Sequence, residues 1–182
     1  MKTTKNVIIK LAQIITVVLL ICMQSCDTEI PAEDLDPPTF RFEIIGDGFS
    51  QAFDQDTDFD SFQLNLREDA AYDFVFSAGD PDGMKQIQWQ FTSAYVELET
   101  AVPSNWVLST SGLSTFMNWF GNESNPLTGN ITSGTFRARG KNVNHIFHFM
   151  ARDFGGASAN ENTTYGTLNI YSGNHNTAIR NY

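Results

Sequence analysis

Four aspartates at alternate positions, Asp54, Asp56, Asp58 and Asp60, form the strongest candidate for metal chemistry in the sequence. Calcium takes about six to eight oxygen ligands in proteins, and carboxylates are prominent among them. In an extended chain all four side chains project to one side, where they repel one another unless a cation or water screens them. The segment is not an EF-hand loop, because Asn65 stands where the twelfth-position glutamate is needed. It predicts either a calcium site or a solvated acidic turn.

A second acidic group combines two expected turns of the chain. Asp80 and Asp82 lie in Asp80-Pro81-Asp82-Gly83, and Asp153 precedes Phe154-Gly155-Gly156. Proline presets one turn dihedral and glycine accepts a positive φ, so both segments predict reversals of the chain. Where two such turns lie at the same end of a sandwich, their carboxylates can share a cation. Calcium is the cofactor that either acidic group would take, and solvated turn residues are the alternative for both.

Other site chemistries find little support in the sequence. His145 and His148 are three residues apart, and odd separations along a strand place side chains on opposite faces, so we expect no shared zinc ion. We find neither a Gly-x-Ser-x-Gly nucleophile elbow nor a glycine-rich phosphate loop. The protein is therefore predicted not to be an enzyme. Large aromatic side chains that could bind a partner are Tyr95, Trp106 and Trp119, with closure of the core as their alternative role.

Composition limits the fold and the partners. A chain of 182 residues suits one domain plus a tail, and 13% aromatic with 41% hydrophobic residues can form a core. The net charge of −10 repels phosphate backbones, so nucleic acid is excluded as a partner.

Apolar residues recur at every second position in short runs, which is typical of half-buried antiparallel strands. The runs are Phe40-Phe42-Ile44, Phe62-Leu64-Leu66, Tyr72-Phe74-Phe76, Ile87-Trp89-Phe91, Phe147-Phe149-Ala151 and Leu168-Ile170. We expect a hairpin at residues 80–83, a second hairpin around residues 154–156, and Trp89 in the core. Residues 92–134 are ambiguous, because Leu113, Phe116, Met117 and Phe120 have the spacing of one helix face while a twisted strand pair fits equally.

The segments Phe74–Trp89 and Phe147–Gly156 with Thr167–Tyr171 resemble the strand, acidic turn and strand of bacterial immunoglobulin-like modules. The resemblance covers about 40 of some 130 residues and implies an all-β, immunoglobulin-like antiparallel β-sandwich with an insertion in the middle. The disulfide against which a core tryptophan often packs in such folds has no counterpart here. A lipocalin-like β-barrel is the alternative fold.

The N-terminus is typical of an export signal. Lys2, Lys5 and Lys10 precede a run from Leu11 to Met23 that is apolar except for Gln13 and Thr16. Met23-Gln24-Ser25-Cys26 resembles the lipobox of bacterial lipoproteins, which implies that Cys26 is acylated and becomes the mature N-terminus. Removing residues 1–25 leaves 8 basic against 21 acidic residues, a net charge of −13.

We expect a lipoprotein signal peptide at 1–25, an acidic Pro-rich tether at 26–38, a β-sandwich domain at 39–172 and a polar C-terminal tail at 173–182. The acidic stretch after Cys26 resembles the surface-export signals of Bacteroidota lipoproteins. The expected protein is a module held at the outer membrane by its lipid anchor, on the periplasmic face or the cell surface. It would bind an unknown protein or glycan. The alternatives are a calcium-stabilised structural spacer and an unrecognised envelope enzyme.

Overall fold

The computed structural model describes residues 30–156 and 160–182. The predicted signal peptide and the predicted acylation site, Cys26, lie outside these ranges. Within the described ranges the structure has no helix that is both long and apolar enough to cross a membrane.

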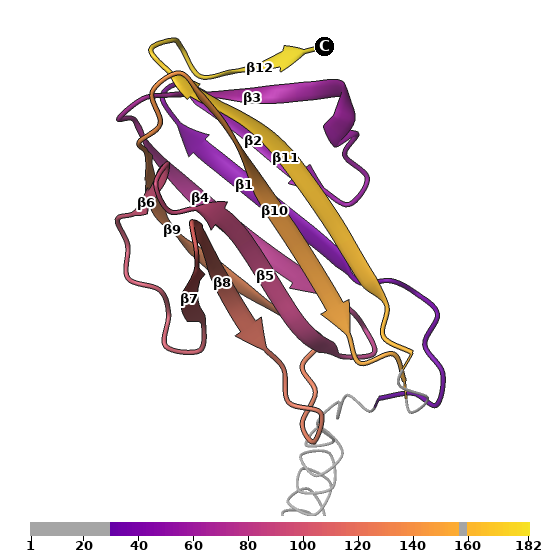
Figure 1. The fold of residues 1–182 in the computed structure, drawn as a ribbon. Helices are drawn as coiled ribbons and strands as arrows, with labels where there is room; N and C mark the ends of the chain where they lie inside the picture. Colours follow the sequence, from indigo (N-terminus) through magenta and orange to yellow (C-terminus); the bar gives the residue numbers. More distant parts are fainter. Residues whose placement is uncertain (1–29, 157–159) are drawn as a thin grey trace, which may run out of the picture.

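Two β-sheets lie face to face and make up the described part of the chain (Figure 1). The five-stranded sheet has the strand order β2-β1-β4-β9-β6, and the seven-stranded sheet has the order β12-β3-β11-β10-β5-β8-β7. A short 3-10 helix, η1, spans Phe59–Ser61. The strands are β1 Thr39–Gly46, β2 Phe49–Asp54, β3 Phe62–Arg67, β4 Ala71–Gly79, β5 Met84–Thr92, β6 Val96–Leu98, β7 Val107–Ser111, β8 Ser114–Phe120, β9 Gly129–Ala138, β10 Val143–Asp153, β11 Thr163–Gly173 and β12 Ala178–Asn181.

The core lies between the sheets and is built from the alternating runs of the sequence. Every second residue of β1, β3, β4, β5, β10 and β11 points inward and is buried, while its neighbours face outward. This follows from the two-residue period of a strand, which puts all apolar side chains of an alternating run on one face. Trp89 is fully buried, as predicted, at the centre of a cluster of aromatic rings.

The structure confirms the predicted all-β sandwich of two sheets. The strands form two separate sheets instead of the closed ring of a lipocalin-like barrel, so the alternative fold is wrong. The strand pairs are antiparallel except β11 with β3, whose residues Ile170–Gly173 pair in parallel with Leu64–Arg67.

The turn at Asp80–Gly83 is sharp but does not form the predicted hairpin. β4 pairs with β1 and β9, whereas β5 pairs with β10 and β8, so the turn carries the chain from one sheet to the other. Gly83 has a φ of 114°, which a residue with a side chain rarely adopts. The second predicted hairpin is confirmed, because β10 and β11 pair along their whole length.

The ambiguous middle segment is made of strands. β7 and β8 form an antiparallel pair at the edge of the seven-stranded sheet, so the strand-pair alternative holds and the helix does not. The predicted polar tail also contains a strand, since β12 pairs with β3 through Ala178–Asn181. The predicted tether is not fully solvated, because Asp34 and Pro38 are buried against the domain.

Candidate functional site

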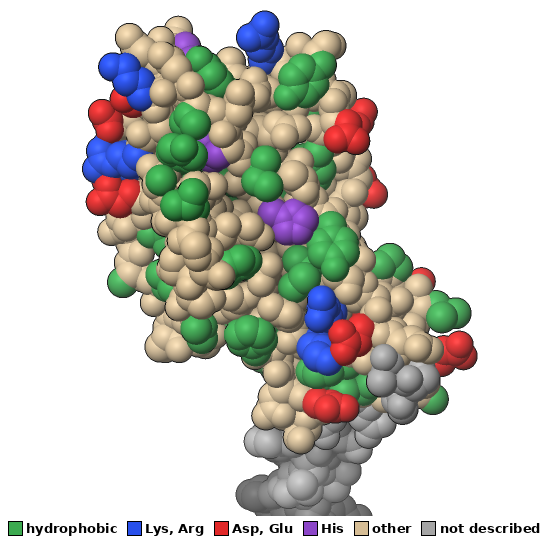
Figure 2. Space-filling view, in the orientation of Figure 1, with side chains coloured by type: hydrophobic (Ala, Val, Ile, Leu, Met, Phe, Trp, Pro, Cys, Tyr) green, Lys and Arg blue, Asp and Glu red, His purple; other side chains and the backbone are tan. Residues whose placement is uncertain are grey.

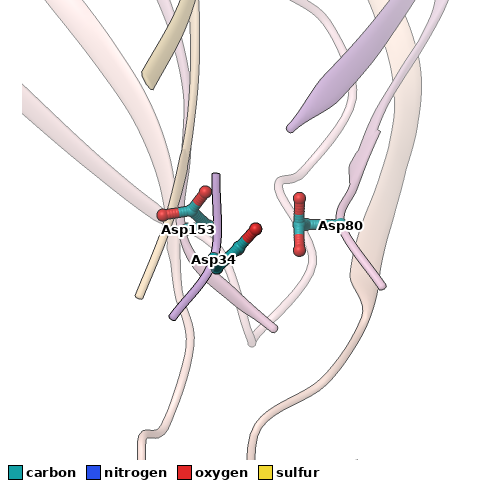
Figure 3. Close-up of side chains that lie close together, drawn as sticks. All are labelled: Asp34, Asp80 and Asp153. Carbon is teal, nitrogen blue, oxygen red and sulfur yellow. The ribbon is translucent and has the colours of Figure 1, made fainter. Parts of the chain in front are cut away.

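Three aspartates from separate parts of the chain meet at one end of the sandwich (Figure 3). Asp34 lies in the segment before β1, Asp80 directly follows β4, and Asp153 is the last residue of β10. One carboxylate oxygen of each lies within 4.8 Å of the others, and the residues are only 5%, 3% and 0% exposed. We call this group the aspartate cluster. Both sheets contribute to it, because β4 belongs to the five-stranded sheet and β10 to the seven-stranded sheet.

Backbone amides position the three carboxylates. The N–H groups of Asp36, Asp82 and Asn162 donate to Asp34 Oδ1, Asp80 Oδ1 and Asp153 Oδ1 at 3.0, 2.8 and 2.8 Å. The side-chain amide of Asn162 also donates to the backbone carbonyl of Asp34 at 3.1 Å, which holds the N-terminal segment against the domain. The second oxygens of Asp34 and Asp153 are buried without a hydrogen-bond partner.

Burial dominates the electrostatics of the cluster. It raises the pKa of Asp80 to about 6. The hydrogen bond from the backbone N–H of Asp82 lowers this pKa, whereas the negative charges of Asp34, Asp153 and Asp82 raise it. Burial also raises the pKa of Asp153, although hydrogen bonds from Asn162 and from the backbone of Gly155 lower it, and the Asp34 charge adds a smaller upward effect. In both groups the cost of burying the charge outweighs the hydrogen bonds that the protein donates to the charged form.

The structure brings together two residues of the predicted second acidic group and replaces the third. Asp80 and Asp153 meet, whereas Asp82 contributes its backbone N–H to Asp80 and lies outside the cluster. Asp34 takes the third place. Its sequence context, an acidic stretch between prolines, indicated a solvated tether and carried no signal for burial.

The aspartates of residues 54–60 do not converge. Asp54 Oδ1 accepts hydrogen bonds from the Asp56 N–H at 3.1 Å and from the Thr57 hydroxyl at 3.0 Å, which closes a tight turn. The helix η1 follows at once, so the extended geometry behind the prediction is lost. Among the described residues, the aspartate cluster is the group in which three or more potential metal ligands come together. The structure therefore does not gather Asp54, Asp56, Asp58 and Asp60 into one group of potential ligands, and the calcium site predicted there stays a prediction without geometric support.

The predicted aromatic binding surface is also corrected. Trp106 and Trp119 are each only 4% exposed and belong to the core, because their large apolar surfaces close the edge of the sandwich. The Trp106 indole N–H donates to Asn130 Oδ1 at 3.2 Å. Tyr95 is half-buried, and its ring packs 5.5 Å from that of His145. None of the three forms an open platform.

The histidines lie on opposite faces of β10, as predicted. His145 is 8% exposed and points inward, where its Nε2 lies 2.9 Å from the hydroxyl of Ser172. His148 faces outward, stacks on Tyr165 with ring centroids 5.7 Å apart, and places Nδ1 2.9 Å from the Thr167 hydroxyl.

The outer surfaces of the two sheets differ in chemistry. On the five-stranded sheet, Arg137 pairs with Glu99 and Arg139 pairs with Glu97, each at 2.6 Å. The outer surface of the seven-stranded sheet is instead rich in amides, hydroxyls and aromatic rings. Its uncharged residues, which we call the neutral face, are Gln63, Asn65, Gln86, Gln88, Gln90, Phe116, Asn118, Asn144, Ile146, His148, Thr163, Tyr165, Thr167, Asn169 and Tyr171. Asn118 is almost fully buried among them. The basic residues Arg67, Arg152 and Arg180 lie on the same side of the sheet, beside this face.

Figure 2 views this neutral face and shows few charged side chains near its middle, whereas red and blue groups gather at the margins. Hydrogen bonds order part of the face: Gln86 Nε2 and Gln88 Nε2 both donate to Asn118 Oδ1, at 3.1 and 2.8 Å. The sequence already showed the alternation of Gln86, Gln88 and Gln90 with core residues. It did not show which other strands would extend this surface, because the order of strands in a sheet depends on distant parts of the chain.

An open hollow of about 500 Å³ lies on the neutral face where β3, β10 and β11 run together. Gln63, Asn144 and Asn169 line it with amides, and Ile146 and Tyr182 add apolar surface. Gln63 Nε2 donates to Asn144 Oδ1 at 3.0 Å across the hollow. The volume falls within the range of roughly 300–1,000 Å³ typical of small-ligand pockets.

Comparisons with known proteins give little further guidance. No protein-family model and no curated protein matches the sequence. Among solved structures, the chain is similar to the cohesin module of a family 33 glycoside hydrolase from Clostridium perfringens ATCC13124. The TM-score is 0.38 and the sequence identity 6%, over 63% of this chain and 98% of that module. At this level of similarity we base no argument on it.

Proposed function

We propose that the protein is a lipid-anchored module of the bacterial outer membrane that binds neutral glycans through its neutral face. The observation that carries this proposal is the hollow lined by Gln63, Asn144 and Asn169 on a sheet surface poor in charge. Each side-chain amide offers two donors and a carbonyl acceptor, which match sugar hydroxyl groups that both donate and accept. The exposed ring of Tyr182 and the side chain of Ile146 supply apolar surface for the C–H faces of a sugar ring.

The contrast between the two sheets favours a neutral ligand over a charged one. Ion pairs lie on the five-stranded sheet at its β6–β9 edge, as expected for a solvated surface. The amides and hydroxyls of the neutral face carry no net charge themselves, and the arginines Arg67, Arg152 and Arg180 lie beside them near the strand ends. Affinity on such a surface comes from hydrogen bonds and ring contacts.

Affinity electrophoresis in gels that contain soluble xylan, mannan or starch tests the glycan proposal. We expect at least one polysaccharide to retard the wild-type protein. Asn144→Ala combined with Asn169→Ala should abolish most of the retardation, because two of the three lining amides are lost. The matched control is Gln51→Ala, which removes an exposed amide from the other sheet and should migrate like wild type. Equal retardation of the double variant and wild type would contradict the proposal.

The anchor is tested separately at Cys26. Acyl chains contribute about 0.8 kcal/mol per buried CH₂ and supply nearly all of the membrane affinity of such a protein. Cys26→Ala should therefore move the protein from the detergent phase to the aqueous phase in a phase-partitioning experiment. A variant that partitions into detergent as fully as wild type would show that the lipoprotein interpretation is wrong.

A further inference from the structure

The aspartate cluster has an uncompensated negative charge. Three carboxylates lie within 4.8 Å of one another and are at least 95% buried, an arrangement that is costly unless the charges are paired or bind a metal. Among the described residues, no ion pair includes any of them. The basic residues closest in sequence to Asp80 and Asp153 are Lys85 and Arg152, and both pair with Glu161 instead.

The hydrogen bonds of the cluster leave two buried carboxylate oxygens without a donor. Each carboxylate has one oxygen that accepts a backbone N–H, so its orientation is set by the protein. The second oxygens of Asp34 and Asp153 have no donor, although both side chains are more than nine-tenths buried. Figure 3 shows the Asp34 carboxylate directed toward Asp80. Oriented, buried oxygens without donors are what a cation site requires.

We propose that Asp34, Asp80 and Asp153 form a calcium site that fastens the segment of residues 30–38 to the sandwich. Calcium is favoured because all three ligands are hard oxygen donors and because it adapts to irregular oxygen shells, including carboxylates that bind with both oxygens. Magnesium keeps several water ligands, and this site is almost excluded from solvent. Zinc sites in proteins are built mainly from cysteine and histidine, which are absent from the cluster.

The ion links three parts of the molecule. Asp80 ends a strand of one sheet, Asp153 ends a strand of the other, and Asp34 belongs to the segment that leads back to Cys26. Where Cys26 carries the anchor of the proposed function, Asp34 is eight positions further along the chain, a reach of at most about 29 Å. Calcium then holds the end of the sandwich that bears the cluster close to the membrane. The site itself does not depend on the anchor.

Titration calorimetry on the full-length chain in detergent, after treatment with EDTA, tests the site with CaCl₂ as the probe. We expect one calcium ion per chain, with a Kd at or below the range of about 10⁻⁴–10⁻³ M of extracellular modules. Because the site exists only in the folded state, calcium at one hundred times its Kd should raise the folding equilibrium constant about 100-fold and shift the melting temperature upward. An equal shift with MgCl₂ at the same concentration would overturn the assignment to calcium.

Matched variants distinguish calcium binding by the aspartate cluster from a general effect of negative charge at this end of the sandwich. Asp153→Asn and Asp34→Asn should each lose the calcium heat and the calcium-dependent melting shift. Asp82→Asn removes the same charge from the same end of the sandwich but lies outside the cluster, so it should bind like wild type. If Asp82→Asn lost binding as fully as Asp153→Asn, or if wild type gave no calcium heat, the site would be disproved.

Limited proteolysis tests the fastening role. Glu33 is exposed and directly precedes Asp34, so a glutamate-specific protease can cleave the segment there. Calcium should slow cleavage after Glu33 in wild type and have no effect in Asp153→Asn. Cleavage at the same rate with calcium and with EDTA in wild type would overturn the fastening role.

Discussion

Replacing Trp89 by alanine is expected to lower the free energy of unfolding by about 3–5 kcal/mol, the usual cost of truncating a large buried aromatic side chain. Trp89 is fully buried, and its ring centroid lies 4.7–5.9 Å from those of Phe42, Phe74, Phe91, Phe136 and Phe147. These rings come from both sheets, so the cavity would open at the centre of the sandwich. Denaturant melts followed by circular dichroism measure the loss.

Two variants define the origin of that loss. Trp89→Phe keeps an aromatic ring and removes an indole N–H that is buried without a partner, so it should cost clearly less than alanine. Phe120→Ala truncates a ring that is 58% exposed and should change stability by no more than about 0.5 kcal/mol. An unchanged midpoint for Trp89→Ala, or a largely helical spectrum of the wild type, would contradict the architecture.

Local periodicity predicted the inward faces of the strands correctly, because the period of two is a property of each strand alone. Phe42, Phe74 and Phe149 point inward as their spacing indicates. Strand pairing was harder to predict. The sequence Asp80-Pro81-Asp82-Gly83 makes the same sharp turn whether its flanking strands pair with each other or enter different sheets, and that choice depends on distant strands.

One ambiguity and one error came from surfaces that break the usual alternation. β8 carries apolar residues on both faces, with Phe116 and Phe120 outward and Met117 and Trp119 inward, so its pattern also fits a helix. β12 is exposed on both faces and has no alternation, although its backbone pairs with β3.

The candidate sites also depend on contacts between distant parts of the chain, which the sequence alone does not show. Asp80 and Asp153 could be paired from the sequence, since each lies where an expected strand ends in a turn. Asp34 could not, because its burial depends on how the N-terminal segment docks and on a hydrogen bond from Asn162, 128 positions away. The neutral face needed the strand order as well, since its rows come from strands that are far apart in the chain.

His145 should make the protein sensitive to acid. Burial lowers the pKa of His145 to about 4, against 6.5 for an ordinary histidine, because the charged ring would lose its hydration. The unfolded chain therefore binds a proton more readily than the folded protein between these two values. The contribution of neutral His145 to stability is fully present above pH 6.5 and is lost as the pH falls toward 4. A shift of this size corresponds to roughly 3 kcal/mol.

Comparison of wild type with His145→Gln isolates this contribution. The raised pKa of Asp80 acts in the opposite sense over part of the same range, since the folded state then holds the extra proton. Asp80 is present in both proteins, so its effect cancels in the difference. We expect the stability of wild type relative to His145→Gln to stay constant from pH 8 to about 6.5 and to decrease by roughly 3 kcal/mol by pH 4. Glutamine does not titrate and can still hydrogen-bond to Ser172, which pairs with His145 Nε2 in the structure. Urea melts at a series of pH values measure this difference in the free energy of unfolding. A difference that stays constant down to pH 4 would mean that His145 takes up its proton in the folded protein as easily as in the unfolded chain.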